Sequence, residues 1–397
     1  MSLRFVNARI VRADGVEEGE LFVTGDTIAE RTDDAQVIDC GGKWLAPAII
    51  DLGAFAIDPA ACRAGGIVRV ALMPDQSPVL DDPGIVRRAA TMGKPELWVH
   101  PLAAATRGLH GADLAEMAIT ASGGARAVAT GRRWITDSGV MRRVLAYARD
   151  LDLTLVTHAE DAGLVGDAVA TDGLTATLHG LASAPAVAEA LAVARDVMLA
   201  EDTGARLHIR QVTTAAALDL IRAAKRRGVA VTCGTTPAHL LLSDIAVSDF
   251  RSFAHLSPPL RSEGDRRACL AAMADGTIDV IASGHDPRGP EEKRLPFADS
   301  APGMAAARTL LALALGIARD AEVPMERLFA MLAATPARIL GLDAGVLAAG
   351  QPADLILFDD GAPWQIDAPR DGNTPFDGLP VQGKVLRVWK GGREYGR

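Results

Sequence analysis

The sequence of 397 residues is poor in aromatic side chains and has no closely spaced cysteine pair. Phe, Trp and Tyr make up 4% of the chain and apolar residues 49%, so the core must be mostly aliphatic. Such a core suits helices packed around buried parallel strands better than a β-sandwich alone. Cys40, Cys62, Cys233 and Cys269 are far apart and form no C-x-x-C motif, which is typical of reduced thiols in a cytosolic protein.

Other absences exclude whole classes of function. The formal net charge is −9 and no basic stripe interrupts it, which argues against a nucleic-acid surface or an anionic-membrane surface. No apolar run reaches the roughly 18 residues needed to cross a bilayer. Residues 1–15 alternate like a strand and do not resemble a targeting segment. We therefore expect a soluble, cytoplasmic protein that binds neither nucleic acid nor membrane.

The order of the elements predicts an α/β fold, with a (β/α)8 barrel of the TIM type between residues 48 and 343. Eight apolar segments with strand character alternate with helical periods, as that barrel requires. The strand candidates are residues 48–52, 66–73, 97–102, 125–130, 153–158, 206–212, 229–233 and 278–283. The helix candidates are residues 113–122, 138–151, 185–204, 215–228, 265–276 and 301–320. In such a barrel, chemistry belongs to side chains just past the C-terminal ends of the strands.

Both ends of the chain consist of short alternating strands broken by turns. Residues 1–47 and 344–397 each lack the apolar surface to be stable alone. We therefore expect the two termini to pair into one small β-sandwich domain beside the barrel.

Several stretches resemble dihydroorotases of the amidohydrolase superfamily, in the order and spacing of that family. They are LMPDQSP, TDSGVMRR, THAED, TTPAHLLLSD, SPPLR, GTIDVIAS, ATPARILGL, GQPADLILF and NTPFDG. The resemblance covers nearly the full length. It implies a barrel with a flanking β-domain, a two-metal site for which zinc is expected, and hydrolytic ring opening of dihydroorotate in pyrimidine synthesis.

The positions that correspond to the family's metal ligands mostly lack donor atoms. They are Gly53 and Phe55 for the first histidine pair, Thr130 or Gly131 for the acidic ligand, Gln211 for a later histidine, and Gly284, followed by His285, for the final Asp. Only His158 is retained. A cation needs several donors to replace its hydration shell, and one imidazole cannot supply them. Without a metal the attacking water is not activated, and Gly284 cannot act as the general base. We therefore predict no bound metal and no catalytic residues, only a vestigial pocket that also includes His239.

The substrate-binding positions implied by the resemblance have changed as well. Ile57 stands where the family has the arginine that grips the substrate carboxylate, and Asp75 and Ser257 stand where it has asparagines. Arg288 replaces a second histidine after the last strand. A simple change of metal would preserve substrate recognition, so the loss of both sets of residues favours lost chemistry.

Three functions remain open. The favoured one is a dihydroorotase-like pseudoenzyme, a homo-oligomer that assembles with aspartate carbamoyltransferase, as the resemblance suggests. The second is a cyclic amide hydrolase with one metal at a site reorganised around the four residues His158, His239, His285 and Asp286. The third is a metabolite sensor in which Arg261 and Arg288 contact an anion.

The same residues also have purely structural interpretations. His158 is better explained as a hydrogen-bonded residue at a strand end, since one donor makes no metal site. Arg261 is equally suited to binding an anion and to holding its loop against the barrel. Asp286 and Arg288 are close enough in sequence to form an ion pair in a Gly-rich loop. Glu160 and Asp161 are placed to cap the helix that follows them.

Overall fold

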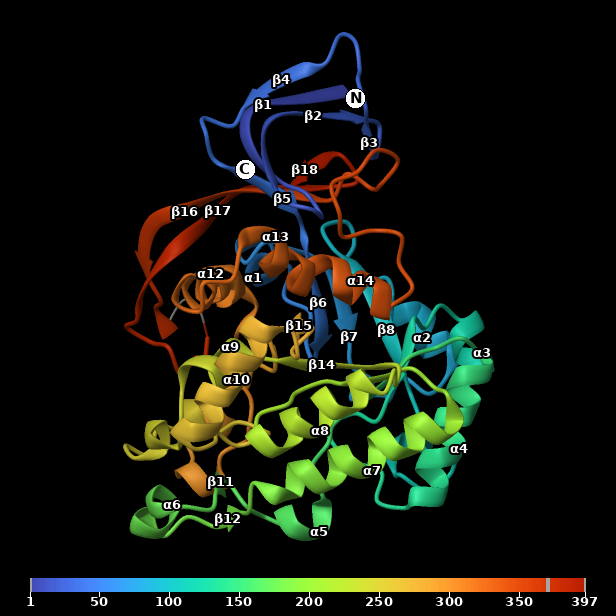
Figure 1. The fold of residues 1–397 in the computed structure, drawn as a ribbon, viewed down its shortest axis with the longest axis vertical. Helices are drawn as coiled ribbons and strands as arrows, with labels where there is room; N and C mark the ends of the chain where they lie inside the picture. The colour runs from blue at the N-terminus through green and yellow to red at the C-terminus, as the bar shows by residue number, and fades with distance from the viewer. Residues whose placement is uncertain (1, 369–371, 396–397) are drawn as a thin grey trace.

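The computed structural model describes residues 2–368 and 372–395 of the chain. Met1, 369–371 and 396–397 lie outside the described residues, and all of them belong to the predicted terminal domain. Figure 1 shows the remainder as a helix-covered barrel with a smaller β-structure at its upper end, where both chain termini lie. No helix within the described residues is long and apolar enough to span a membrane.

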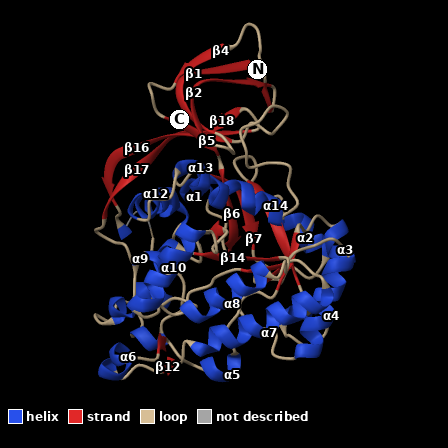
Figure 2. Cartoon of the chain, viewed as in Figure 1, coloured by secondary structure: helices blue, strands red, loops and turns tan. Residues whose placement is uncertain are grey.

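All eight predicted barrel strands are present and parallel. They are β6 (Ile49–Ala54), β7 (Ile67–Leu72), β8 (Trp98–Ala104), β9 (Ala127–Ala129), β10 (Leu155–Thr157), β13 (Leu207–Ile209), β14 (Val231–Thr235) and β15 (Val280–Ile281). The sheet runs in chain order from β6 to β15, and helices surround it in Figure 2. The predicted (β/α)8 barrel is therefore confirmed.

Asp51 joins the first and last barrel strands. Its carboxylate accepts a hydrogen bond from the backbone N–H of Ser283 at 2.8 Å and another from the Ser283 hydroxyl. The backbone N–H of Phe55 also donates to the carbonyl of His285 at 2.8 Å. The acidic residue in the first strand thus closes the barrel.

Several of the helices around the barrel begin at a side chain that caps them. The main helices are α1 (Pro59–Ala64), α2 (Pro83–Ala89), α3 (Met117–Ser122), α4 (Ser138–Asp150), α7 (Val187–Thr203), α8 (Ala215–Arg226), α10 (Glu263–Asp275) and α12 (Leu310–Asp320). Asp137 accepts from the N–H of Val140 to start α4, and Thr214 caps α8 in the same way. Such caps satisfy N–H groups that have no partner within the helix.

Shorter helices lie in the segments that follow the barrel strands and after α12. They are α5 (Ala162–Val165), α6 (Leu174–His179), α9 (Pro237–Leu241), α11 (Pro290–Lys293), α13 (Met325–Phe329) and α14 (Thr335–Ile339). Asp161 caps α5 by accepting from the N–H groups of Gly163 and Leu164, as predicted. Glu160 does not cap, because its carboxylate binds buried side chains instead.

The predicted helix over 301–320 begins nine residues late. Met304 pairs with His285 as an isolated bridge, and the N–H of Asp286 donates to the Met304 carbonyl at 2.8 Å. The first part of the segment is therefore held against the loop after β15 and cannot turn into a helix. A short 3-10 turn, Ala307–Thr309, leads into α12.

Strands from the two termini pair with one another, as the sequence predicted, and they form one eight-stranded sheet where a β-sandwich was expected. They are β1 (Ser2–Val11), β2 (Val16–Thr24), β3 (Thr27–Ala29), β4 (Gln36–Asp39), β5 (Trp44–Pro47), β16 (Leu355–Gln365), β17 (Pro380–Lys390) and β18 (Arg393–Tyr395). The two ends meet in the antiparallel pair of β5 and β16, and again in a bridge between Thr27 and Pro352. A core of its own packs around Phe5 and Trp389, whose rings meet edge to face at 4.8 Å.

Candidate functional site at the barrel mouth

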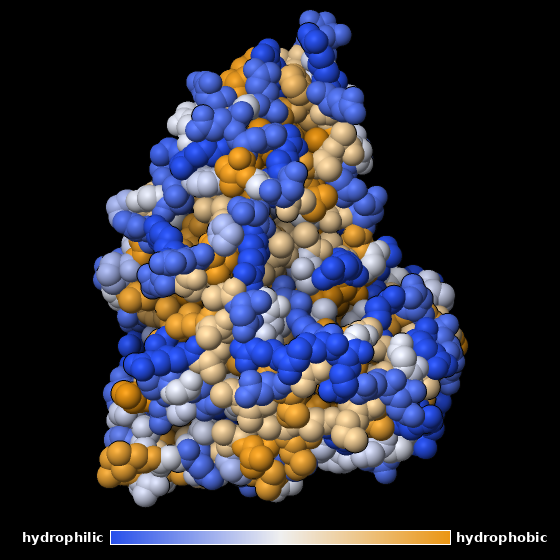
Figure 3. Space-filling model, in the orientation of Figure 1, coloured by the Kyte–Doolittle hydropathy of each residue, from blue (hydrophilic) through white to orange (hydrophobic). Residues whose placement is uncertain are grey.

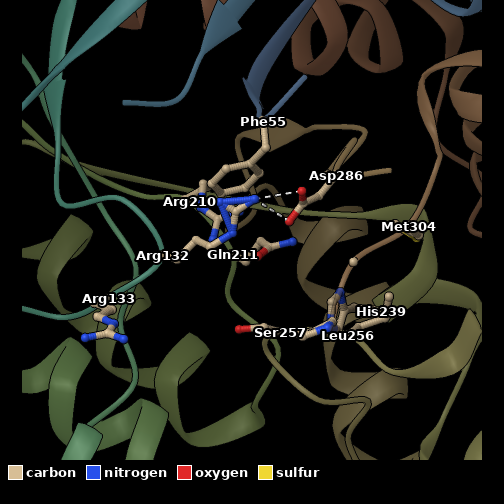
Figure 4. A pocket seen from close by; sticks show the side chains of 13 residues that line it. Phe55, Arg132, Arg133, Arg210, Gln211, His239, Leu256, Ser257, Asp286 and Met304 are labelled. Atoms are coloured by element: carbon tan, nitrogen blue, oxygen red, sulfur yellow. Dashed lines mark hydrogen bonds and ion pairs between the residues drawn. The ribbon is translucent and has the colours of Figure 1, made fainter. Parts of the chain in front are cut away.

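A cavity of about 190 Å³ opens at the C-terminal ends of the barrel strands, and we call it the mouth pocket. It is lined by Phe55, Arg132, Arg133, Arg210, Gln211, His239, Leu256, Ser257, Gly284, Asp286, Pro302, Gly303 and Met304. Figure 4 shows the Phe55 ring, the Arg132 and Arg210 guanidinium groups, Gln211 and Asp286 converging there, while Arg133 lies at a distance. The pocket therefore lies where a barrel of this kind carries its functional residues.

Arg210 takes up space beside the first metal-ligand position. It directly follows β13, and its side chain is 4% exposed. A Cβ atom added to Gly53 would lie 3.1 Å from Cδ of Arg210, so a histidine at residue 53 would require the arginine to move. Burial lowers the pKa of Arg210 to about 10, with the Asp75 and Asp286 carboxylates opposing the effect, so the guanidinium stays charged at neutral pH.

Arg132 forms a second fixed cation in the pocket. Its Nη2 atom donates to both oxygens of Asp286, at 2.7 and 2.8 Å, and its backbone N–H donates to Asp75. The guanidinium carbons of Arg132 and Arg210 lie 3.9 and 4.9 Å from the centroid of the Phe55 ring. Phe55 therefore supports two cations through its π face.

His158 is hydrogen-bonded through both ring nitrogens. Nδ1 lies 3.4 Å from Nη2 of Arg210, and because a guanidinium only donates, Nδ1 must accept. Nε2 then carries the proton and faces Glu160 Oε2 at 3.2 Å. No lone pair of the imidazole remains free in this arrangement.

Glu160 connects His158 to a buried ion-pair network. Its carboxylate accepts from Arg261 at 2.5 Å, and Arg261 also lies 3.5 Å from Glu189. Burial alone would raise the pKa of Glu160, but the hydrogen bond from His158 and the charge of Arg261 outweigh it and hold the pKa at about 2. Arg261 donates further to Thr213. The anion that Arg261 contacts is thus internal, and the residue holds its loop to the barrel.

The two remaining histidines of the reorganised-site hypothesis are engaged separately. Nε2 of His239 donates to the Pro258 carbonyl at 3.0 Å, and Nδ1 accepts from Thr236. Nδ1 of His285 accepts from backbone N–H groups of the segment before α12. Burial lowers the pKa of each histidine to about 4, so both are neutral at pH 7.

The residues at the mouth do not fit the two-metal site that the resemblance implies. Within residues 2–368 and 372–395, no group of three or more His, Cys, Asp or Glu side chains converges to hold an ion. His158 is occupied on both nitrogens, and a buried cation, Arg210, lies beside it. Gly284 has φ +65°, and a Cβ there would lie 2.9 Å from Cγ2 of Thr236. Restoring the family's final Asp would therefore strain the backbone.

The structure brings some of the predicted pocket residues together and separates others. Phe55, Gln211, His239 and Gly284 line the mouth pocket. The Thr130 hydroxyl accepts from the N–H of His158 at 3.1 Å. Three further positions pack around them without lining the cavity: Gly131 against Asp75, Gly53 against Arg210, and His285 against the segment before α12.

Arg288 is placed outside the pocket lining. Its Nη2 atom pairs with Asp286 at 2.9 Å, and its Nε donates to the Pro302 carbonyl at 2.8 Å. The chain thus forms the predicted ion pair in a Gly-rich loop, and the carboxylates that Arg288 contacts are those of Asp286 and, at 3.7 Å, Glu292.

The sequence reasoning missed Arg132 and Arg210, the two guanidinium groups that dominate the pocket. A signal for Arg210 was available, because it is a charged residue directly at the end of an apolar strand. Charged side chains are seldom buried there unless they are paired or functional.

Comparisons with known proteins agree with the architecture. The model of the amidohydrolase family matches residues 104–395. A dihydroorotase of Syntrophotalea carbinolica is 37% identical over 99% of this chain and 98% of its own length. A dihydroorotase of Anaeromyxobacter dehalogenans is 37% identical over 96% of this chain and 93% of its own.

Solved structures resemble the chain over its whole length. The L-hydantoinase (dihydropyrimidinase) from Arthrobacter aurescens superposes with a TM-score of 0.87 at 21% identity, covering 99% of this chain and 95% of that one. A D-hydantoinase from Thermus sp. superposes with a TM-score of 0.82 at 21% identity, over 99% and 94% of the two chains. At this identity the likeness concerns the fold.

Proposed function

The chain belongs to the amidohydrolase family as a dihydroorotase-like member, and from that premise we propose that it serves pyrimidine synthesis as a catalytically inactive partner of aspartate carbamoyltransferase. The proposed inactivity rests mainly on one observation. The Arg210 guanidinium is buried between Phe55 and His158, beside the positions at which the family has its first histidine pair. A fixed positive charge repels a divalent cation and leaves a water molecule there without activation.

Two further features support inactivity. Gly284 offers no titratable group in place of the family's general base, and the backbone conformation there disfavours any side chain. The single-metal alternative needs His158, His239, His285 and Asp286 to converge. His158, His239 and Asp286 are already bound to other protein groups, and the acceptor nitrogen of His285, Nδ1, is occupied by backbone N–H groups.

Metal analysis together with a turnover assay tests this part of the proposal. The chain, purified without chelator, is expected to contain less than a stoichiometric amount of transition metal and to leave dihydroorotate unopened. The dihydroorotase of Syntrophotalea carbinolica, prepared in the same way, is the positive control. Tightly bound zinc together with ring opening by the isolated chain would refute inactivity.

An exposed apolar face supports the role as an assembly partner. Hydrophobic side chains gather along the lower edge of the molecule in Figure 3, where Figure 1 places α5 and α6. Leu174 and Leu178 on α6 are 74% and 71% exposed, and Val187 and Leu191 at the start of α7 are also exposed. Clusters of this kind mark protein contacts more often than free surface.

Co-purification tests the partner. The transferase is expected to co-elute with the wild-type chain in size-exclusion chromatography with light scattering. The double variant Leu174→Asp, Leu178→Asp is expected to bind it at least about tenfold more weakly. The control is Ile119→Asp on α3, an apolar side chain that is 50% exposed outside this face.

Two outcomes would count against the partner role. A transferase that assembles and works normally without this protein would refute it. A change in self-association alone would assign the apolar face to a second copy of this chain, as in the predicted homo-oligomer.

A further inference from the structure

A second cavity, of about 580 Å³, lies between the barrel and the terminal sheet, and we call it the rear pocket. On the barrel side it is lined by Arg69 of β7 and by Trp98, the first residue of β8. On the sheet side it is lined by Lys390 and Arg393, at the adjoining ends of β17 and β18. The mouth pocket lies at the other end of the barrel strands. The volume of the rear pocket is within the roughly 300–1,000 Å³ of small-molecule sites.

The lining of the rear pocket carries excess positive charge, although the chain as a whole has a net charge of −9. Its charged side chains are four cations and two carboxylates: Arg69, Lys94, Lys390, Arg393, Asp26 and Asp354. Arg69 and Asp354 neutralise each other in an ion pair of 2.6 Å. The other three cations form no ion pair with a described residue, and the exposed Asp26 is the one lining carboxylate left to balance them.

Two of these cations are held side by side. Lys390 and Arg393 are directly opposite each other in the antiparallel pair of β17 and β18, so their side chains share a face of the sheet. Gly391 and Gly392, with φ +53° and +70°, make the tight turn that joins them. Like charges at opposite positions destabilise a sheet, so this arrangement lacks an anion between the two side chains.

The ammonium of Lys390 is the most enclosed of the three. Its side chain is 8% exposed, and it donates to the Pro95 carbonyl. An ammonium has three N–H donors, and the carbonyl takes one of them. Burying a cation without a counter-ion is costly, and an anion in the rear pocket would relieve that cost.

Aromatic surface lies beside these cations. The Lys390 ammonium is 3.9 Å from the centroid of the Trp98 ring and 5.9 Å from that of Tyr395. Trp98 nevertheless remains 37% exposed. An exposed tryptophan next to cations is the combination on which proteins stack a base while they hold its phosphate.

We propose that the rear pocket binds a mononucleotide, with its phosphate held by Lys94, Lys390 and Arg393 and its base against Trp98. A phosphate monoester carries about −1.5 to −2 charges at pH 7 and three strong acceptor oxygens, which suits several unpaired cations. The overall negative charge of the chain disfavours a longer nucleic acid. This site goes beyond the proposed function, since it uses no residue of the mouth pocket.

Isothermal titration calorimetry with the purified full-length chain at pH 7.5 tests the site. The probes are the four ribonucleoside 5′-monophosphates, the matching nucleosides without phosphate, and ribose 5-phosphate without a base. At least one monophosphate is expected to bind saturably, and its nucleoside and ribose 5-phosphate at least about tenfold more weakly. Because no transferase is present and no turnover is measured, the result is independent of the proposed partner role and of the proposed inactivity.

Variants with opposite expected signs locate the binding. Lys94→Gln and Arg393→Gln remove exposed cations and should weaken the monophosphate at least about tenfold at an unchanged melting temperature. Asp26→Asn removes the unpaired carboxylate and should strengthen it. Trp98→Leu should reduce the monophosphate to the affinity of ribose 5-phosphate. The matched control is Arg133→Gln, which removes an exposed arginine from the mouth pocket and should bind normally.

Several results would overturn the inference. If none of the four monophosphates binds, or if ribose 5-phosphate or the nucleoside binds as tightly, the rear pocket does not recognise a nucleotide. Full affinity in both Lys94→Gln and Arg393→Gln would show that these cations do not hold the phosphate. A loss of affinity in Arg133→Gln alone would place the binding at the mouth pocket instead.

Discussion

At the scale of single residues, two buried arginines near the barrel mouth have opposite surroundings. Arg261 is surrounded by carboxylates, and its pKa is raised because the charges of Glu160 and Glu189 outweigh the effect of burial. Arg210 lies beside a histidine and an aromatic ring, and burial lowers its pKa. The first arginine contributes to stability through its carboxylate partners, whereas the second has no carboxylate within hydrogen-bonding distance among the described residues.

Replacing Glu160 tests the stabilising half of this contrast. The folded pKa of about 2 lies below the ordinary value of 4.5, so the contribution of Glu160 is complete above that value and is lost as the pH falls towards 2. At pH 7, Glu160→Gln should lower the free energy of unfolding, towards the lower end of the roughly 3–5 kcal/mol for a broken buried pair, since Glu189 still faces Arg261. Urea denaturation of both proteins between pH 7 and pH 3 should show the difference shrinking.

The control for this series is Glu201→Gln, which breaks the exposed pair with Arg227. Surface pairs contribute little, so its effect should be much smaller. If the difference in the free energy of unfolding between the wild type and Glu160→Gln does not change with pH, the stabilising role given to the Glu160 ion-pair network is wrong.

At the scale of elements, the closure of the barrel depends on one polar contact between β6 and β15. Asp51 is fully buried, and burial raises its pKa, while the hydrogen bonds from Ser283 act in the opposite direction. Because β15 is only two residues long, side-chain and loop contacts replace a full ladder of backbone hydrogen bonds at this seam.

Substitutions at Asp51 measure the strength of that seam. Asp51→Ala leaves the N–H and hydroxyl of Ser283 buried without a partner, which should lower the free energy of unfolding by about 1–3 kcal/mol. Asp51→Asn keeps one acceptor and should cost less. Urea denaturation at pH 7 should therefore rank the proteins as wild type, Asn, then Ala. Equal stability of all three would show that the barrel closes by other contacts.

The elements were more predictable from the sequence than the site was. All eight barrel strands were found because buried parallel strands are continuous apolar runs. The helix predicted over 301–320 was nine residues too long at its N-terminal end. The bridge between Met304 and His285 prevents helix formation there, and it joins segments that are far apart in the sequence. The residues at the positions that the resemblance assigns to metal ligands could be compared one by one in the sequence. The role of Arg210 could not be found in this way, because it depends on the space left by Gly53 on another strand.

At the scale of the whole molecule, the terminal sheet and the barrel share contacts that should make them unfold together. Ile356 and Phe358 of β16 belong to the same buried cluster as the barrel helices, and the Phe358 ring lies 5.6 Å from that of Phe329 in α13. Arg69 on β7 pairs with Asp354, just before β16, at 2.6 Å. Both side chains of this pair are nearly buried.

Asp354→Asn tests this coupling. The substitution breaks a buried ion pair and weakens the acceptor for the N–H of Gly391, so the free energy of unfolding should fall by roughly 3–5 kcal/mol. If the two parts unfold as one, hydrogen exchange by mass spectrometry should show the same loss of protection in β1 of the terminal sheet and in β10 of the barrel. Glu20→Gln, which breaks an exposed ion pair within the terminal sheet, should leave the protection of β1 and of β10 nearly unchanged. A loss confined to β1 would mean that the barrel is stable without the sheet, and that the two ends of the chain form an independent unit.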